Sequence, residues 1–145
     1  MSLDVYLLGK KKKMMVKCYA CGHEHEEKAR ARLYGANITH NLGEMAEKAG
    51  VYEALWRPHR LRSDYNIRQA DFTAEDEFEA SVVIRAKEII PYLEKGLADL
   101  KARPTYYEQF NSPNGWGLYK HFVPFVEGYL NACKQYPDAI VEVSR

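Results

Sequence analysis

A long stripe of apolar side chains at helical spacing constrains this sequence more than any other feature. Thr73, followed by Asp76 and Glu77, precedes the stripe as a capping box that would start a helix. The members of the stripe are Phe78, Val82, Ala86, Ile89, Ile90, Leu93, Leu97 and Leu100. We therefore predict a helix over residues 74 to 102, kinked between residues 87 and 91 because of Pro91. Such a stripe has to be buried, so the rest of the chain must pack against it.

Two further helices and several short strands can supply that packing. Apolar spacing predicts a helix over residues 39 to 49, ended by Gly50, and another over residues 117 to 135, interrupted by Pro124. Segments rich in β-branched and aromatic residues predict strands over 3 to 8, 14 to 18, 29 to 36 and 139 to 143, the first two joined by a turn at Gly9 and the lysines after it. The expected fold is one α+β domain over residues 1 to 145, with a small antiparallel sheet packed against three main helices.

Charge and hydropathy narrow the functional classes. The 145 residues have a net charge of +1, distributed as +4 over residues 1 to 36 and −3 over the remainder. A domain this close to neutrality lacks the strongly basic character of a dedicated nucleic-acid-binding protein, although its basic amino end would favour a polyanion. No apolar run approaches the roughly 18 to 20 residues that cross a bilayer, which predicts a cytoplasmic protein without a membrane partner.

A pair of cysteines near the amino end is the clearest chemical signal. Two cysteines three positions apart, followed by Gly22, allow one turn to direct both sulfurs at one ion, and tetrahedral zinc takes four Cys or His ligands. The predicted zinc ligands are Cys18, Cys21, His23 and His25, with His40 as an alternative.

Two interpretations without metal compete with a structural zinc at residues 18 to 25. The first is a pair of reduced thiols in an exposed turn. The second is a thioredoxin-like redox pair, which we disfavour because such a pair opens a helix, whereas the flanks here alternate like strands. An odd number of cysteines also argues against a disulfide framework, and Cys133 lies on the apolar stripe of the last helix.

Side chains suited to binding a ligand gather at three places in the sequence. The first is residues 37 to 42, where polar side chains without permanent charge can either cap a helix or line a site. The second is the start of a long loop over residues 58 to 72, and the third is a turn with two glycines and a proline over residues 111 to 117. For each tryptophan in these segments, burial in the core is the alternative. The predicted ligand-binding residues are Asn37, Thr39, His40, Asn41, Trp56, Arg57, Asn114 and Trp116.

Four segments together resemble a group of small uncharacterised proteins encoded by bacteriophages and prophages. The segments are residues 37 to 42, residues 55 to 58, residues 114 to 117 with Tyr119, and residues 141 to 145. The resemblance spans residues 16 to 145, and members of the group also tend to carry a Cys-x-x-Cys near the amino end. It implies a phage context and a shared fold, and it implies no reaction or substrate.

The sequence therefore favours a non-catalytic protein that binds a small molecule or a partner protein in a polar pocket. No nucleophile elbow, phosphate loop or zincin helix appears in the sequence. One alternative is a small enzyme in which His40 acts as general acid or base, or as a catalytic metal ligand. Another is a nucleic-acid-binding accessory protein, with Lys10 to Lys13, Arg30 and Arg32 contacting phosphates and Trp56 or Trp116 stacking on a base.

Overall fold

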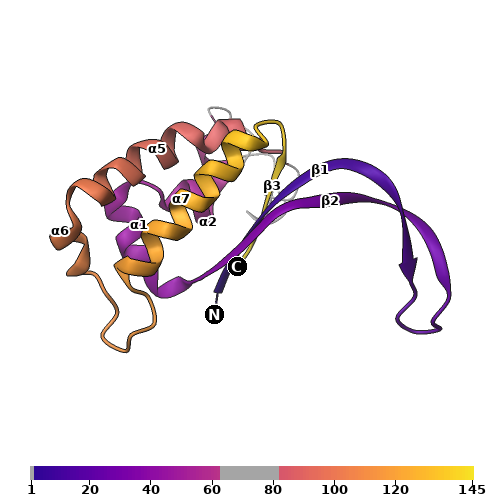
Figure 1. The fold of residues 1–145 in the computed structure, drawn as a ribbon, viewed down its shortest axis with the longest axis horizontal. Coiled ribbons are helices and arrows are strands. Elements are labelled where there is room, and N and C mark those ends of the chain that lie inside the picture. Colours follow the sequence, from indigo (N-terminus) through magenta and orange to yellow (C-terminus); the bar gives the residue numbers. More distant parts are fainter. Residues whose placement is uncertain (1, 63–81) are drawn as a thin grey trace, which may run out of the picture.

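Two long antiparallel strands form the most extended part of the protein (Figure 1). The computed structural model describes residues 2 to 62 and 82 to 145. Strand β1 (Ser2–Lys17) pairs with β2 (Glu24–Thr39) along their whole lengths, from Ser2 opposite Thr39 to Lys17 opposite Glu24. Strand β3 (Ile140–Ser144) pairs with β1 only between Asp4 and Leu8, giving the order β2–β1–β3. Residues 9 to 31, which we call the arm, therefore extend away from the rest of the protein.

The helices pack beside the half of the sheet that β3 completes. Their bounds are η1 (His40–Leu42), α1 (Gly43–Ala49), α2 (Tyr52–Trp56), η2 (Pro58–Leu61), α5 (Ala86–Ala102), α6 (Pro104–Glu108) and α7 (Tyr119–Gln135). Helices α5 and α7 lie side by side (Figure 1). Buried side chains of both helices join one apolar cluster with the alternate residues Leu3, Val5 and Leu7 of β1. The predicted α+β fold is confirmed.

The predicted turn at residues 9 to 13 is wrong, because these residues continue β1. Lys11, Lys12 and Lys13 pair with residues 28 to 30 of β2, and the irregularity between Leu8 and Lys11 is a shift in register. A strand exposed on both faces tolerates lysines, since their side chains stay in water while the backbone is paired. The chain reverses instead at residues 18 to 23, where Gly22 has φ 73° and its N–H donates to the carbonyl of Cys18.

The predicted start of the long helix is also wrong. Helix α5 begins at Ala86, after Arg85 in extended conformation, and Glu88 Oε2 accepts from the N–H of Arg85 at 2.6 Å. Residues 82 to 85 instead run beside β3, where the N–H of Val141 donates to the carbonyl of Ile84 at 2.9 Å. The segment is rich in β-branched residues, which suit a strand, and the spacing of its apolar residues fits a strand as well as a helix. Phe78 and the proposed capping box at Thr73 lie outside the described residues.

The remaining helix predictions differ in accuracy. Gly50 ends α1 with φ 75°, and α2 ends before Pro58, as predicted. The interruption predicted at Pro124 is wrong, because α7 continues through it; the residue removes one backbone donor, and buried side chains on both sides hold the helix together. Within residues 2 to 62 and 82 to 145, no helix has both the length and the apolar character needed to cross a membrane.

Candidate functional site

The polar segment after β2 changes from strand to helix at Thr39. Thr39 keeps extended backbone angles, and its hydroxyl accepts a hydrogen bond from the N–H of Asn41 at 3.4 Å. Thr39 therefore caps η1, as the alternative interpretation of this segment expected. Asn37 and the side chain of Asn41 have other partners: Asn37 Nδ2 donates to Asp4 Oδ1 across the β1–β2 pair at 2.7 Å. Capping thus accounts for only one of the polar side chains.

The loop between α6 and α7 packs against the same segment. Asn41 Nδ2 donates to the carbonyl oxygen of Trp116 at 2.7 Å. Gly117 comes so close that an added Cβ would lie 2.9 Å from Asn41 Cβ, and its φ of 120° also requires glycine. Within the loop, Asn114 Oδ1 accepts from the N–H of Trp116 at 2.9 Å and from Ser112 Oγ at 2.6 Å. These bonds fix the backbone of Trp116, whose side chain is 72% exposed.

The segment and the loop together line an open cavity of about 690 Å³. Its lining residues are Ser2, Asn37, Thr39, His40, Asn41, Asn114 and Trp116. Six of the eight predicted ligand-binding residues are thus brought to one place from two distant parts of the sequence. Trp56 and Arg57 are not among the lining residues. Ser2 was missed because only its pairing with Thr39 brings it there, and no local motif marks such a residue.

Trp56 supports the cavity indirectly, through His40. The indole is only 2% exposed and stacks on Tyr52 with ring centroids 5.2 Å apart. Its Nε1–H donates to His40 Nδ1 at 3.0 Å, so a neutral His40 carries its proton on Nε2. His40 Nε2 is buried and has no hydrogen-bond partner among the described residues. The cavity therefore has beside it a buried donor whose orientation is set by the core.

The cysteine turn lies at the end of the arm, far from this cavity. The N–H of Cys18 donates to the carbonyl of His23 at 2.7 Å, which closes the turn. Hydrogen bonding from Cys21 lowers the pKa of the Cys18 thiol, and both cysteines belong to this one short turn. His25 lies within β2, where its Nε2 is 3.2 Å from Glu27 Oε1. In the described parts of the chain, no three His, Cys, Asp or Glu side chains are grouped as metal ligands. The turn brings together the two predicted thiols and not the two predicted histidines.

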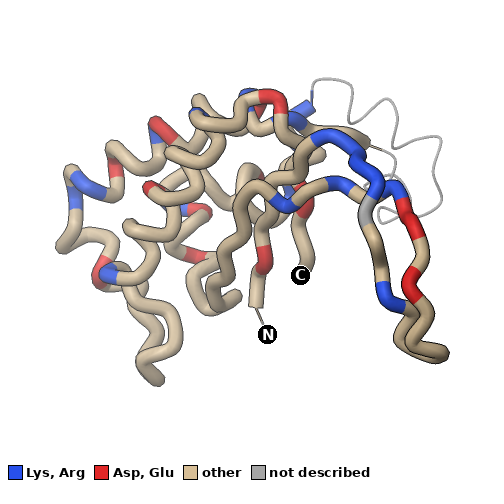
Figure 2. The backbone as a smooth tube through the Cα atoms, turned by 45° about the vertical axis from the view of Figure 1, so that its right-hand side comes forward, with Lys and Arg blue, Asp and Glu red and all other residues tan. Residues whose placement is uncertain are grey.

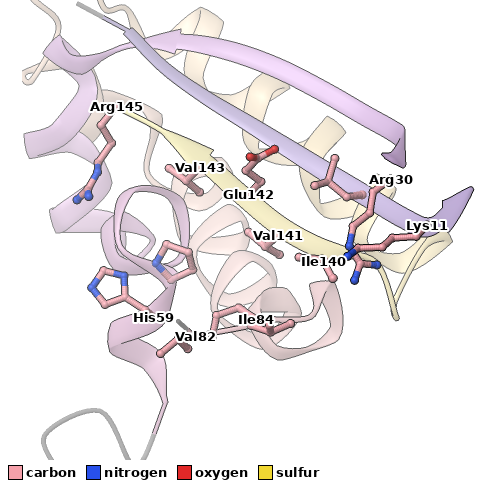
Figure 3. Close-up of a pocket in the computed structure, with 13 residues that line it drawn as sticks. Lys11, Arg30, His59, Val82, Ile84, Ile140, Val141, Glu142, Val143 and Arg145 are labelled. Atoms are coloured by element: carbon pink, nitrogen blue, oxygen red, sulfur yellow. The ribbon is translucent and has the colours of Figure 1, made fainter. Parts of the chain in front are cut away.

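A second cavity, of about 670 Å³, lies against β3 (Figure 3). Valine and isoleucine side chains of β3 and of residues 82 to 84 form much of its lining. Lys11 and Arg30 lie next to each other at one end of this cavity, and Arg145 lies toward the other. The cavity therefore combines an apolar wall with two cations from neighbouring strands of the arm.

Comparisons with protein-family models, with curated proteins and with solved structures find no match to this chain. The resemblance to phage-encoded proteins stays a prediction. The argument for function therefore rests on the residues around the polar cavity and on the charges and thiols of the arm.

Proposed function

We propose that the protein binds a small, uncharged ligand that carries several hydroxyl groups and one apolar face, as a saccharide does. The observation that carries this proposal is the lining of the polar cavity, where an exposed tryptophan on a braced loop faces a set of uncharged hydrogen-bonding side chains. Aromatic rings bind apolar faces of ligands, and a few placed polar groups set orientation and specificity. No carboxylate, lysine or arginine side chain is among the lining residues, so a neutral ligand fits best.

The hydrogen-bonding capacity left in the cavity suits hydroxyl groups. Asn114 Oδ1 is occupied by two bonds within the loop, which leaves the two N–H donors of its amide for a ligand. Asn37 and Asn41 each use one amide N–H in the fold, which leaves their Oδ1 atoms as acceptors. The hydroxyls of Ser2 and Thr39 both donate and accept. A ligand hydroxyl also donates and accepts, so it can use both kinds of group.

The surroundings of His40 favour binding over catalysis. Its Nδ1 accepts from Trp56, and its Nε2 is buried, so neither nitrogen is placed to exchange protons freely with a substrate. No carboxylate among the lining residues stands beside it to act as a partner. An acceptor atom of a ligand that reached Nε2 would satisfy a buried donor, which is a source of binding free energy.

Replacing Trp116 with alanine is expected to weaken ligand binding by at least about tenfold, which corresponds to about 1.4 kcal/mol. The expected ligands come from a panel of mono- and disaccharides, screened by saturation-transfer NMR and measured by titration calorimetry. Trp116→Phe should restore part of the affinity, because a phenyl ring still offers an aromatic face. Tyr92→Ala, which removes an exposed aromatic side chain from α5, is the matched control and should leave binding unchanged. Equal affinity of the wild type and Trp116→Ala would contradict the proposal, as would a panel with no binder.

A second candidate function, binding of a nucleic acid by the arm, is favoured by one specific observation. Lys11 lies opposite Arg30 and Lys13 lies opposite Lys28, so two cationic pairs stand one after the other on one face of the ribbon. Like charges directly opposite each other destabilise a sheet, and the described residues hold no ion pair with any of the four. Figure 2 shows that basic residues gather along the arm. A polyanion would offset their repulsion, and a two-stranded ribbon fits the major groove of DNA.

Affinity for a 20-base-pair duplex is therefore expected to fall steeply with salt, with a slope of about −3 to −4 for the logarithm of the association constant against the logarithm of the salt concentration. Lys11→Glu with Lys13→Glu should abolish binding at moderate salt. The control, Lys95→Glu with Lys120→Glu, makes the same change in net charge on the exposed faces of α5 and α7 and should bind nearly as well as the wild type. Absence of binding at low salt, or equal loss in both double variants, removes this candidate. Trp56 is buried and is not available for base stacking in this structure.

A further inference from the structure

The cysteine turn is accessible to solvent, and its two cysteines can supply two of the four ligands of a zinc site. It forms the far end of the arm (Figure 1), and Cys21 and Tyr19 are both exposed there. The backbone bonds from Gly22 to Cys18 and from Cys18 to His23 hold the turn in one shape. That shape holds Cys18 and Cys21 in one short turn at the far end of the arm. Tetrahedral structural zinc requires four ligands from protein, so two more must come from elsewhere.

The nearby histidines are poorly placed to supply the missing ligands. His25 belongs to the paired part of β2, opposite Val16, and its imidazole contacts Glu27. His23 follows the turn, and its carbonyl is already used to close it. His23 and His25 are two residues apart, so an extended chain would direct both to one face of the ribbon, yet neither is grouped with the two cysteines among the described residues. In this structure one chain therefore does not gather the imidazoles around the sulfurs.

The helical body does not supply the missing ligands either. Its described cysteine, Cys133, is fully buried in the apolar cluster on α7. His40 accepts from Trp56 at the opposite end of β2 from the turn. Since the arm extends away from the helices (Figure 1), neither residue is near the turn. The turn of another copy of this chain has two thiols with the same geometry and the same exposure.

We propose that the turn binds zinc together with the same turn of a second copy, so that Cys18 and Cys21 of each chain form a four-thiolate site that joins two chains tip to tip. The contact is isologous and closes on itself, as a twofold dimer requires. Four zinc–sulfur bonds form, the four thiol protons pass to solvent, and no atom changes oxidation state. The inference does not depend on the ligand proposed for the polar cavity.

The charges around the tip are compatible with such a contact. Lys17 and Glu24 face each other at the last pair of the hairpin, so a twofold arrangement can place each lysine near the glutamate of the other chain. The run of lysines ends at Lys13, five residues before Cys18, which corresponds to about 16 Å of strand. This separation exceeds the Debye length of about 8 Å at physiological salt, so repulsion between the two basic segments is largely screened at the tip.

Zinc should therefore convert the full-length protein from monomer to dimer at half an equivalent of metal per chain. The experiment uses protein kept in a phosphine reductant, titrated with zinc, with its mass followed by light scattering and its metal content by elemental analysis. A mass of twice 16.8 kDa is expected with zinc, and 16.8 kDa after a chelator. Cobalt in place of zinc should give the absorption of a tetrahedral four-thiolate site.

Two sets of variants complete the test. Cys18→Ser with Cys21→Ser should bind less than about a tenth of an equivalent of zinc and stay monomeric, and unfolding is not expected because both residues lie in a terminal turn outside the core. His23→Ala with His25→Ala should still dimerise with zinc. A monomer holding one zinc per chain that is lost in the histidine variant would overturn the proposal in favour of a site within one chain. Absence of zinc binding, or a dimer that persists in the serine variant, would also overturn it.

Discussion

Replacing Gly96 with alanine is expected to lower the free energy of unfolding by about 3 kcal/mol, the upper part of the range for overpacked sites. Gly96 lies in α5 where the helix crosses residues 49 to 51. An added Cβ would lie 2.1 Å from Val51 Cγ1 and 2.9 Å from the carbonyl oxygen of Ala49. Val51 is fully buried, and the Ala49 carbonyl is backbone, so neither can move aside without shifting an element. Urea denaturation followed by circular dichroism measures the loss.

Gly43→Ala is the matched control for that experiment. Gly43 has φ −56° and ψ −44°, and the nearest atom to an added Cβ is Tyr52 Cε2 at 3.8 Å, an ordinary contact distance. Alanine at this helical position should be neutral or stabilising by up to about 1 kcal/mol, because alanine has the higher helix propensity. If Gly96→Ala were as stable as the wild type, α5 would not approach residues 49 to 51 as closely as described.

Replacing Trp56 with alanine is expected to cost about 3 to 5 kcal/mol of stability, as for other buried aromatic residues. The indole is 2% exposed, stacks on Tyr52 and donates to His40, so the substitution leaves a cavity and an unpaired acceptor together. Calorimetric unfolding measures the loss. A stability within about 1 kcal/mol of the wild type would mean that the indole is not part of the core.

Trp56→Phe separates packing from the hydrogen bond. A phenyl ring keeps much of the contact with Tyr52 and removes the donor to His40 Nδ1. The expected result is a smaller loss of stability together with a change in the tautomer of His40, read from the nitrogen chemical shifts of its imidazole. Unchanged shifts would show that another group sets the tautomer. Because His40 lines the polar cavity, the same variant tests whether its orientation affects ligand affinity.

The sequence predicted the structure correctly where the residue types of a segment favour a single local conformation. Gly50 takes the left-handed conformation that ends α1, and the apolar residues from Ala86 to Leu100 are buried on one face of α5. The candidate site was predictable for a related reason. Asn41, Asn114 and Trp116 lie in segments that hold more polar amides and glycines than a simple link between two elements needs. The structure brings these residues to one cavity. Nothing in the spacing, however, predicts that residues 111 to 117 pack on residues 39 to 41.

Predictions from the sequence failed where the residues suit two different local structures equally well. Val82 and Ala86 have the spacing of the predicted helical stripe, whereas Val82 and Ile84 alternate as in an extended segment, and pairing with β3 makes residues 82 to 85 extended. The lysines at 10 to 13 suit a turn as well as a solvated strand, and only the pairing with β2 distinguishes the two. In both cases the deciding partner is distant in the sequence. The long loop predicted over residues 58 to 72 is wrong at its start, where η2 forms over Pro58–Leu61, and residues 63 to 72 lie outside the described residues.

The pairing of β3 with β1 has a consequence for how this chain acquires its fold. Residues 4 to 8 of β1 pair on one edge with β2 and on the other with residues 140 to 144. During synthesis the hairpin can form early, since its strands are joined by a short turn, whereas the second edge of β1 has no partner until β3 has emerged from the ribosome. Closing so long a loop is slow, and an open edge is prone to pair with other chains. The nascent protein therefore depends on its last strand to cover an edge that its first strand exposes.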